Sequence, residues 1–239
     1  MTLFELEKDD GVAIIKMANG ENRQNLVFAE SLSSLLDEIL DDKEMFSIII
    51  TSSDKKNFSQ GVDIEWLVKR FEQKDFKSIK SFLYAMNDVF KKFLLMPVPV
   101  IAAINGHAIG NGAMLACASD FRFMKKDRGF FCFPEVDISI PFLPGMIAFV
   151  RKAMPEYKFN ELKLTGRKVT AQELFEHHII EKASDDQAAL MDDAISFAKT
   201  FKKKRNIFSE HKKRMHKKII EVIDTQDPEY IDTLNIFMS

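Results

Sequence analysis

Two glycine-containing turns are the first features of this sequence that could carry out chemistry. Ser59–Val62 follows the apolar run Phe46–Thr51, and Gly110–Gly112 follows the apolar run Val98–Ile104. A turn that leads from a strand into a helix leaves backbone N–H groups without intrahelical partners, and the helix dipole favours negative charge there. Two such N–H groups from separate loops form an oxyanion hole if the loops meet. The simpler interpretation of either turn alone is a plain connection.

Glu135 is a candidate general base. It follows Phe133 and Pro134 in a Phe-rich run, and an apolar pocket would raise the pKa of its carboxyl toward the working range. From these residues alone, a surface glutamate at the end of a strand is the favoured interpretation. On a strand, Asp137 would share a face with Glu135, although a solvated or capping role is favoured for it. His107 has no sequence partner and is interpreted as structural.

Short apolar segments and helical patterns alternate along most of the chain, which predicts a mixed α/β fold. A hairpin is predicted over Leu3–Met17, with a turn at Asp9–Gly11. Further strands are predicted over Phe46–Thr51, Val98–Ile104, Phe121–Met124 and Phe130–Phe133. Helices are predicted over Val27–Leu40, from Glu65, and over Phe76–Leu95 and Ala113–Cys117. From Met146 onward the pattern is helical, over Met146–Met154, Lys158–Leu164, Ala171–Phe175, Ala188–Phe201 and Phe208–Ile223.

Composition limits the classes of function. The chain has 239 residues, a net charge of −2 and 46% hydrophobic residues, so it can fill a core and no general nucleic-acid-binding surface is indicated. The basic run Lys202–Arg205 is interpreted as a solvated helix end. The two cysteines are interpreted as reduced core thiols. No apolar run is long enough for a membrane helix and the first residues do not form a signal peptide, so a cytoplasmic protein without membrane or nucleic-acid partners is expected.

Three ordered segments together resemble the crotonase superfamily, the enoyl-CoA hydratase/isomerase family. They are FSQGVDIEWL, PVPVIAAINGHAIGNGAMLACASDFRF and DRGFFCFPEVDISIPFLPG. Leu164–Ala171 resembles a later segment of that family, and Asn22–Asn25 resembles its early coenzyme A loop. The resemblance covers nearly the whole chain, except that the C-terminal part matches only in being helical.

The resemblance implies an α/β fold, the crotonase (ClpP-like) β-α superhelix of stacked ββα turns with a C-terminal helical region. Residues 1–185 would form the core with an acyl-CoA site, and residues 186–239 a helical region for trimerisation or for covering the site. The assembly would be a homotrimer or a dimer of trimers. The ligand would be an acyl-CoA thioester, with coenzyme A as part of the substrate and no metal or other cofactor.

The resemblance also assigns roles to residues of this chain. The oxyanion donors map onto the backbone N–H groups of Val62 and of Asn111, where the family usually has glycine. An N–H survives this change, because only proline lacks one. The catalytic glutamate maps onto Glu135. The residues assigned to substrate binding are Asn22, Arg23, Gln60, Gly61, Asp63, Ile64, Gly110, Met114 and Phe133.

Met114 decides between the branches of the family. Hydratases of the family have a second glutamate at this position, and two carboxylates suit the activation of a water. Methionine has no titratable proton, so the chain resembles the Δ3,Δ2-enoyl-CoA isomerases, which use one glutamate at the position of Glu135. The expected function is a shift of a 3-enoyl-CoA double bond to trans-2-enoyl-CoA in fatty acid metabolism. The alternatives are an enoyl-CoA hydratase, another crotonase-type acyl-CoA enzyme, or a non-catalytic acyl-CoA-binding protein.

Overall fold

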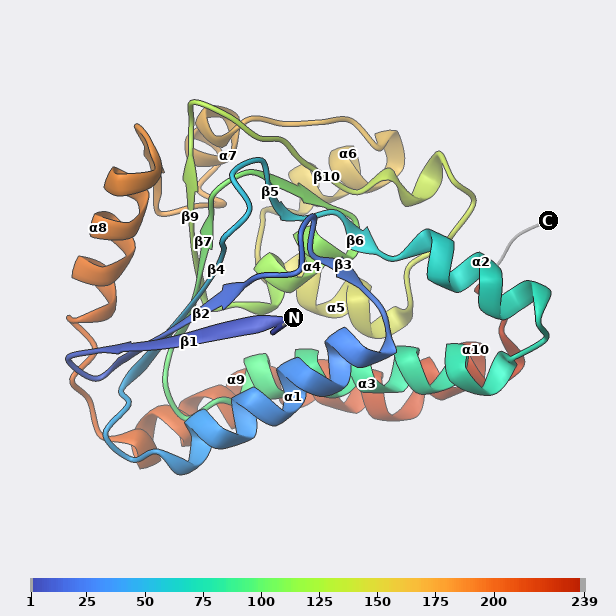
Figure 1. Ribbon diagram of the computed structural model, residues 1–239, viewed down its shortest axis with the longest axis horizontal. Helices are drawn as coiled ribbons and strands as arrows, with labels where there is room; N and C mark the ends of the chain where they lie inside the picture. The colour runs from blue at the N-terminus through green and yellow to red at the C-terminus, as the bar shows by residue number, and fades with distance from the viewer. Residues whose placement is uncertain (1, 237–239) are drawn as a thin grey trace.

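A six-stranded sheet forms the centre of the molecule in the computed structural model, which describes residues 2–236 (Figure 1). Its strand order is β1-β2-β4-β7-β9-β11. All neighbouring strands are parallel except β1 and β2, which form the predicted antiparallel hairpin. The strands are β1 (Phe4–Asp9), β2 (Val12–Met17), β4 (Ser47–Ser52), β7 (Val100–Ile104), β9 (Phe121–Lys125) and β11 (Lys182–Ser184).

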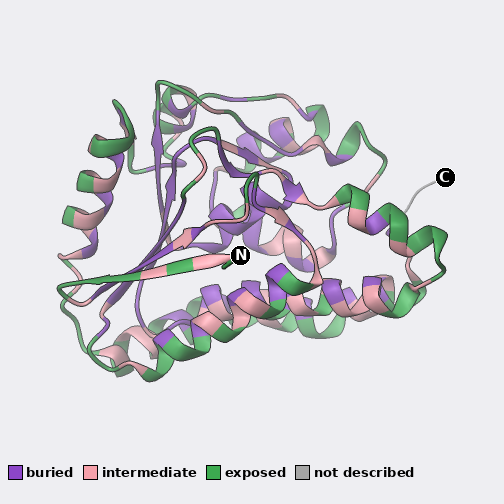
Figure 2. Ribbon diagram, in the orientation of Figure 1, coloured by how far each residue is buried: buried purple, intermediate pink, exposed green. Residues whose placement is uncertain are grey.

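Both faces of the central strands β4 and β7 are buried, which explains why these strands are largely apolar. Successive side chains of a strand point to opposite faces, so Ile49 packs with one cluster while Ile48 and Ile50 pack with the other. Helix α8 (Gln187–Ala198) covers the first face through its buried side chains, and its outer side is exposed (Figure 2). Helices α1 (Leu26–Asp41) and α3 (Phe76–Leu95) lie on the second face. The mixed α/β architecture predicted from the sequence is confirmed.

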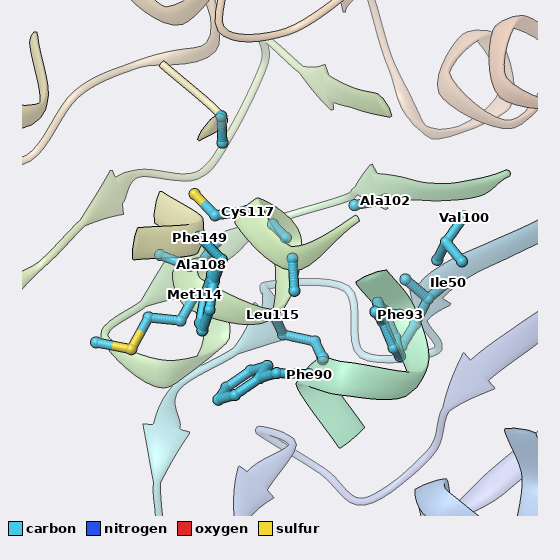
Figure 3. Packing of buried hydrophobic residues seen from close by; sticks show 14 of the residues in the cluster. Ile50, Phe90, Phe93, Val100, Ala102, Ala108, Met114, Leu115, Cys117 and Phe149 are labelled. Atoms are coloured by element: carbon cyan, nitrogen blue, oxygen red, sulfur yellow. The ribbon is translucent and has the colours of Figure 1, made fainter. Parts of the chain in front are cut away.

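Helix α4 (Asn111–Ala118) lies inside the molecule, with every residue buried (Figure 2). Figure 3 shows the packing around it, where the Leu115 side chain extends toward Phe90 of α3. Burial on all sides explains why the sequence of α4 has no polar face. A helix held in this way has little freedom to shift, so the position of its first residue, Asn111, is fixed by the core.

Two small sheets join the loops that follow the central strands. In one, β3 (Arg23–Gln24) pairs with β6 (Gly61–Val62); in the other, β5 (Asn57–Ser59) and β10 (Phe131–Cys132) flank β8 (His107–Ile109). The predicted strand over Phe130–Phe133 is therefore shorter than expected. Pro134 then begins a 3₁₀ helix, η1 (Pro134–Val136), because its fixed φ suits a first helical position. Glu135 lies on this turn, so the expectation that Asp137 shares a strand face with it is wrong.

The remaining helices are α2 (Ile64–Glu72), α5 (Pro144–Lys152), α6 (Glu156–Thr165), α7 (Ala171–Glu176), α9 (Arg205–Thr225) and α10 (Asp227–Thr233). Helix α10 is attached to α3 by three side chains of α3 at the i, i+4, i+7 spacing of one helix face. Lys80 donates to the Asp232 carbonyl (2.6 Å), Tyr84 to the Asp232 carboxylate (2.9 Å), and Asn87 to the Asp227 carboxylate (2.9 Å). The last three residues of the predicted 186–239 region lie outside the described residues.

Within residues 2–236, none of the helices combines the length and the apolar character needed to cross a membrane.

Candidate active site

The two glycine-containing turns, Ser59–Val62 and Gly110–Gly112, meet at the N-terminus of α4. Gly61 has a φ of +77°, and a Cβ atom at this position would lie 2.6 Å from the Ile109 carbonyl oxygen and 3.0 Å from the Asn111 nitrogen. Only glycine fits there, because any side chain would both strain the backbone and collide with the second turn. The contact brings β6 against the N-terminus of α4, although the two turns are about fifty residues apart in the sequence.

The backbone N–H groups of Val62 and Asn111 are both available on this side. Asp63 N–H donates to the Gln24 carbonyl of β3 (2.8 Å), and successive N–H groups of a strand alternate in direction, so Val62 N–H points away from β3. Asn111 is the first residue of α4, whose first intrahelical bond runs from Met114 N–H to the Gly110 carbonyl (2.9 Å). Asn111 N–H therefore has no partner within the helix.

Glu135 faces the same region with its carboxyl group buried; the residue is 8% exposed. A Cβ atom on Gly110 would lie 2.9 Å from Glu135 Oε1, so the carboxyl group lies against the turn that precedes Asn111. Its Oε2 atom accepts no hydrogen bond from the described residues. Burial raises the pKa of Glu135 to about 7, and the Lys163 ammonium opposes this shift only in part. A carboxylate with this pKa accepts a proton readily near neutral pH.

These groups line an apolar cavity of about 240 Å³. Among the described residues, Glu135 is the only acidic side chain that lines it. The apolar wall comes from α2, α3, α4, α5 and the segment after η1. The lining residues are Gln60, Val62, Ile64, Leu67, Phe82, Leu83, Ile109, Gly110, Asn111, Met114, Pro134, Glu135, Ile138, Ile140, Pro141, Phe142, Met146 and Ile236.

Most residues that the sequence assigns to the site line this cavity: Gln60, Val62, Ile64, Gly110, Asn111, Met114 and Glu135. Gly61, Asp63 and Phe133 do not line the cavity and instead hold the elements around it. Gly61 contacts the second turn, Asp63 caps α2 by accepting from Trp66 N–H (3.1 Å), and Phe133 is a core residue whose ring meets that of Phe142 edge-to-face.

The early loop is placed differently from the cavity wall. Asn22 has a fully buried side chain that donates to Ser52 Oγ (2.6 Å) and to the Phe58 carbonyl (2.9 Å). Arg23 is partly exposed and pairs with Glu21 (2.9 Å). The Asn22 amide is thus occupied by structural bonds, and a contact of this loop with substrate stays a prediction for its backbone and for Arg23.

His107 and Asp137 have structural surroundings. His107 Nδ1 accepts from Phe130 N–H (3.2 Å), and its ring lies against the Phe130 ring. Asp137 is exposed, and its backbone N–H donates to the Pro134 carbonyl (2.9 Å), which ends η1.

The sequence did not indicate several other residues that line the cavity. Phe82, Leu83 and Met146 lie on helices with apolar faces, but the sequence does not say which apolar face meets a ligand. Ile236 follows α10, a helix that the sequence analysis did not predict. Gln24 was also missed, although its side chain bonds to Asn111.

A buried carboxylate that lines the same apolar cavity as two free backbone N–H groups can remove a proton next to a carbonyl, and the N–H groups can stabilise the resulting oxyanion. The comparison with known families agrees with this site. The family model described as enoyl-CoA hydratase/isomerase matches residues 7–232. The chain belongs to this family, and the crotonase resemblance drawn from its motifs is confirmed.

Curated relatives include enoyl-CoA delta isomerases of Arabidopsis thaliana. Enoyl-CoA delta isomerase 3 is 31% identical over 206 residues, which span 81% of this chain and 83% of the relative. The peroxisomal enoyl-CoA delta isomerase 1 is 31% identical over 197 residues, which span 81% of this chain and 80% of the relative. Since relatives include peroxisomal proteins, the cytoplasmic location stays a prediction.

The fold also matches solved structures. Human mitochondrial delta3-delta2-enoyl-CoA isomerase superposes with a TM-score of 0.89, covering 97% of this chain and 90% of that one at 18% identity. At this identity the match concerns the fold alone. It confirms the crotonase β-α superhelix with a C-terminal helical region.

Proposed function

We propose that the protein is an enoyl-CoA isomerase that converts 3-enoyl-CoA to trans-2-enoyl-CoA with Glu135 as its single acid–base group. The observation that carries this proposal is that Glu135 is the only acidic side chain lining the cavity among residues 2–236. The isomerase names of the curated relatives support the same reaction. Substrate and product are isomers, so the reaction has no net oxidation and adds no water.

In the proposed mechanism, the thioester carbonyl oxygen accepts hydrogen bonds from Val62 N–H and Asn111 N–H. The Glu135 carboxylate removes a proton from C2, and the negative charge moves to the thioester oxygen as a dienolate. The protonated Glu135 then delivers the proton to C4, which leaves the double bond between C2 and C3. The two N–H donors stabilise the dienolate more than the neutral ester, which is what accelerates the reaction.

Met114 distinguishes this reaction from hydration. Its side chain lines the cavity and is almost fully buried. A thioether accepts hydrogen bonds weakly and carries no proton, so it does not help Glu135 to hold and activate a water. We expect hydration of trans-2-enoyl-CoA to be slow for this reason.

The test offers the purified protein trans-3-hexenoyl-CoA and, separately, trans-2-hexenoyl-CoA, and follows product mass and absorbance. We expect the 3-enoyl substrate to become the 2-enoyl isomer at unchanged mass, and Glu135→Gln to lose this activity by at least about a hundredfold. A gain of one water from trans-2-hexenoyl-CoA at a comparable rate would favour a hydratase. Binding of both thioesters without reaction would favour a non-catalytic acyl-CoA-binding protein.

A further inference from the structure

Gln24 is bonded to both turns of the site, through its side chain and through its backbone. Asn111 Nδ2 donates to Gln24 Oε1 at 2.6 Å, although the two residues are 87 positions apart. Gln24 is 0% exposed and Asn111 is 5% exposed, so water does not compete for this bond. A hydrogen bond shielded from water holds its two groups more firmly than an exposed one.

The backbone of Gln24 holds the other turn. In the β3–β6 pair Gln24 is the register partner of Val62, and its carbonyl accepts Asp63 N–H (2.8 Å). One residue is therefore bonded through its backbone to the strand that carries the Val62 N–H and through its side chain to the residue that carries the second N–H.

The Gln24 side chain is also held by a hydrogen bond at its nitrogen atom. Its Nε2 donates to Ser59 Oγ (3.0 Å), and that hydroxyl donates to the Asn22 carbonyl (2.7 Å) and accepts Gly61 N–H (3.2 Å). These bonds lie within β3, β5 and β6 and the loop before β3, so both the oxygen and the nitrogen of the Gln24 side-chain amide are used for alignment. Rotation of the Gln24 side chain would break bonds at both ends.

We propose that Gln24 is a positioning residue that sets the separation of the Val62 and Asn111 N–H groups, and that the Asn111 side chain is its anchor on α4. The proposal rests on the proposed function, in which these two N–H groups bind the thioester oxygen. The hydrogen bond from the Asn111 side chain to Gln24 is called the tether below. Glycine at position 111 could not make it. A displacement of a donor by about 1 Å costs up to about a hundredfold in rate, so the tether affects catalysis and not only folding.

Two variants remove the bond from opposite sides. Gln24→Met keeps the length of the side chain without an acceptor, and Asn111→Ala keeps the backbone N–H without the tether. We expect each to lower kcat between about tenfold and a hundredfold with little change in KM, because the lost alignment acts on the transition state. The double variant should be no slower than the slower single variant, since both changes remove the same bond.

Thr51→Val is the matched control. Thr51 is also buried, and its hydroxyl donates to the Ala103 carbonyl (2.9 Å), but it does not line the cavity. This variant should lower the midpoint of thermal unfolding about as much as Gln24→Met and leave kcat unchanged. A Gln24→Met enzyme that is folded and retains the wild-type kcat would overturn the proposal, as would multiplicative losses in the double variant.

A spectroscopic measurement separates this proposal from the isomerase assignment. Bound trans-2,trans-4-hexadienoyl-CoA should absorb at longer wavelength than the free thioester when two N–H groups polarise its carbonyl, whether or not the protein isomerises 3-enoyl-CoA. We expect wild type, Thr51→Val and Glu135→Gln to show this shift, and Gln24→Met and Asn111→Ala to show a smaller one. A full shift in both tether variants, or none in wild type, would contradict the positioning role.

Discussion

At the scale of the residue, the reactivity of Glu135 comes from what surrounds it. Its carboxyl group lies in an apolar cavity, one of its oxygens accepts no bond from the described residues, and burial raises its pKa to about 7. The same desolvation makes the ionised form costly in the folded state. Met114 adds no polar partner, so the cavity wall keeps Glu135 a single, poorly solvated base.

The pH dependence of isomerisation follows from this raised pKa. The base must be ionised, so kcat/KM should rise with pH and reach half of its plateau near pH 7, the pKa of Glu135 in the free enzyme. The Lys163 ammonium lies over the Phe142 ring, 3.9 Å from its centroid, and favours the ionised form of Glu135. Lys163→Met should therefore move the midpoint to higher pH.

Lys163→Arg is the control for this prediction, because it keeps the positive charge and should keep the midpoint near that of wild type. The measurement is kcat/KM for trans-3-hexenoyl-CoA across the range in which the enzyme stays folded. A midpoint that moves to lower pH in Lys163→Met would show that the sign of the interaction is wrong.

At the scale of the element, the sequence predicted the long segments well. The helix predicted over Phe76–Leu95 has these bounds in the structure, because an amphipathic pattern and two prolines define it locally. The two-residue strands β3 and β6 were missed and β10 is shorter than predicted, since their extent depends on pairing with distant residues. The family motifs indicated Val62, Asn111 and Glu135. They did not indicate Gln24, because its side-chain contact with the distant Asn111 leaves no local pattern in the sequence.

Ile236, which follows α10, should limit the length of the acyl chain. Ile236 lines the cavity and packs in a small apolar cluster with Leu143 and Ile231, next to Leu83 and Met146. Ile236→Ala should lengthen the cavity and raise kcat/KM for trans-3-dodecenoyl-CoA relative to trans-3-hexenoyl-CoA by about fivefold, the scale of one or two methylene contacts.

The matched control is Ile223→Ala, which removes an equally buried isoleucine from α9 that does not line the cavity. It should lower stability and leave the ratio of the two substrates unchanged. An unchanged ratio in Ile236→Ala would mean that another part of the wall sets the chain length.

At the scale of the whole molecule, the site draws on nearly the full length of the chain. Gln24, Val62, Asn111, Glu135 and Ile236 belong to five different segments, and the central sheet with its two covering layers brings them together. Because the site exists only when these segments are packed, loss of the core anywhere should also remove activity.

The assembly state is the prediction at this scale. The family resemblance leads us to expect a trimer or a dimer of trimers, and exposed apolar side chains are available for contacts between chains. Tyr157 and Leu164 of α6 are seven residues apart, on one face of the helix, and Leu164 is 71% exposed. Light scattering should give three or six times the chain mass of 27.5 kDa.

Leu164→Glu should lower this mass if α6 lies at the interface, because a buried charge opposes association. Val27→Glu, at an exposed residue of α1 outside the predicted 186–239 trimerisation region, controls for the added charge. A wild-type mass of one chain at micromolar concentration would contradict the predicted assembly and require the site to be complete within a single chain.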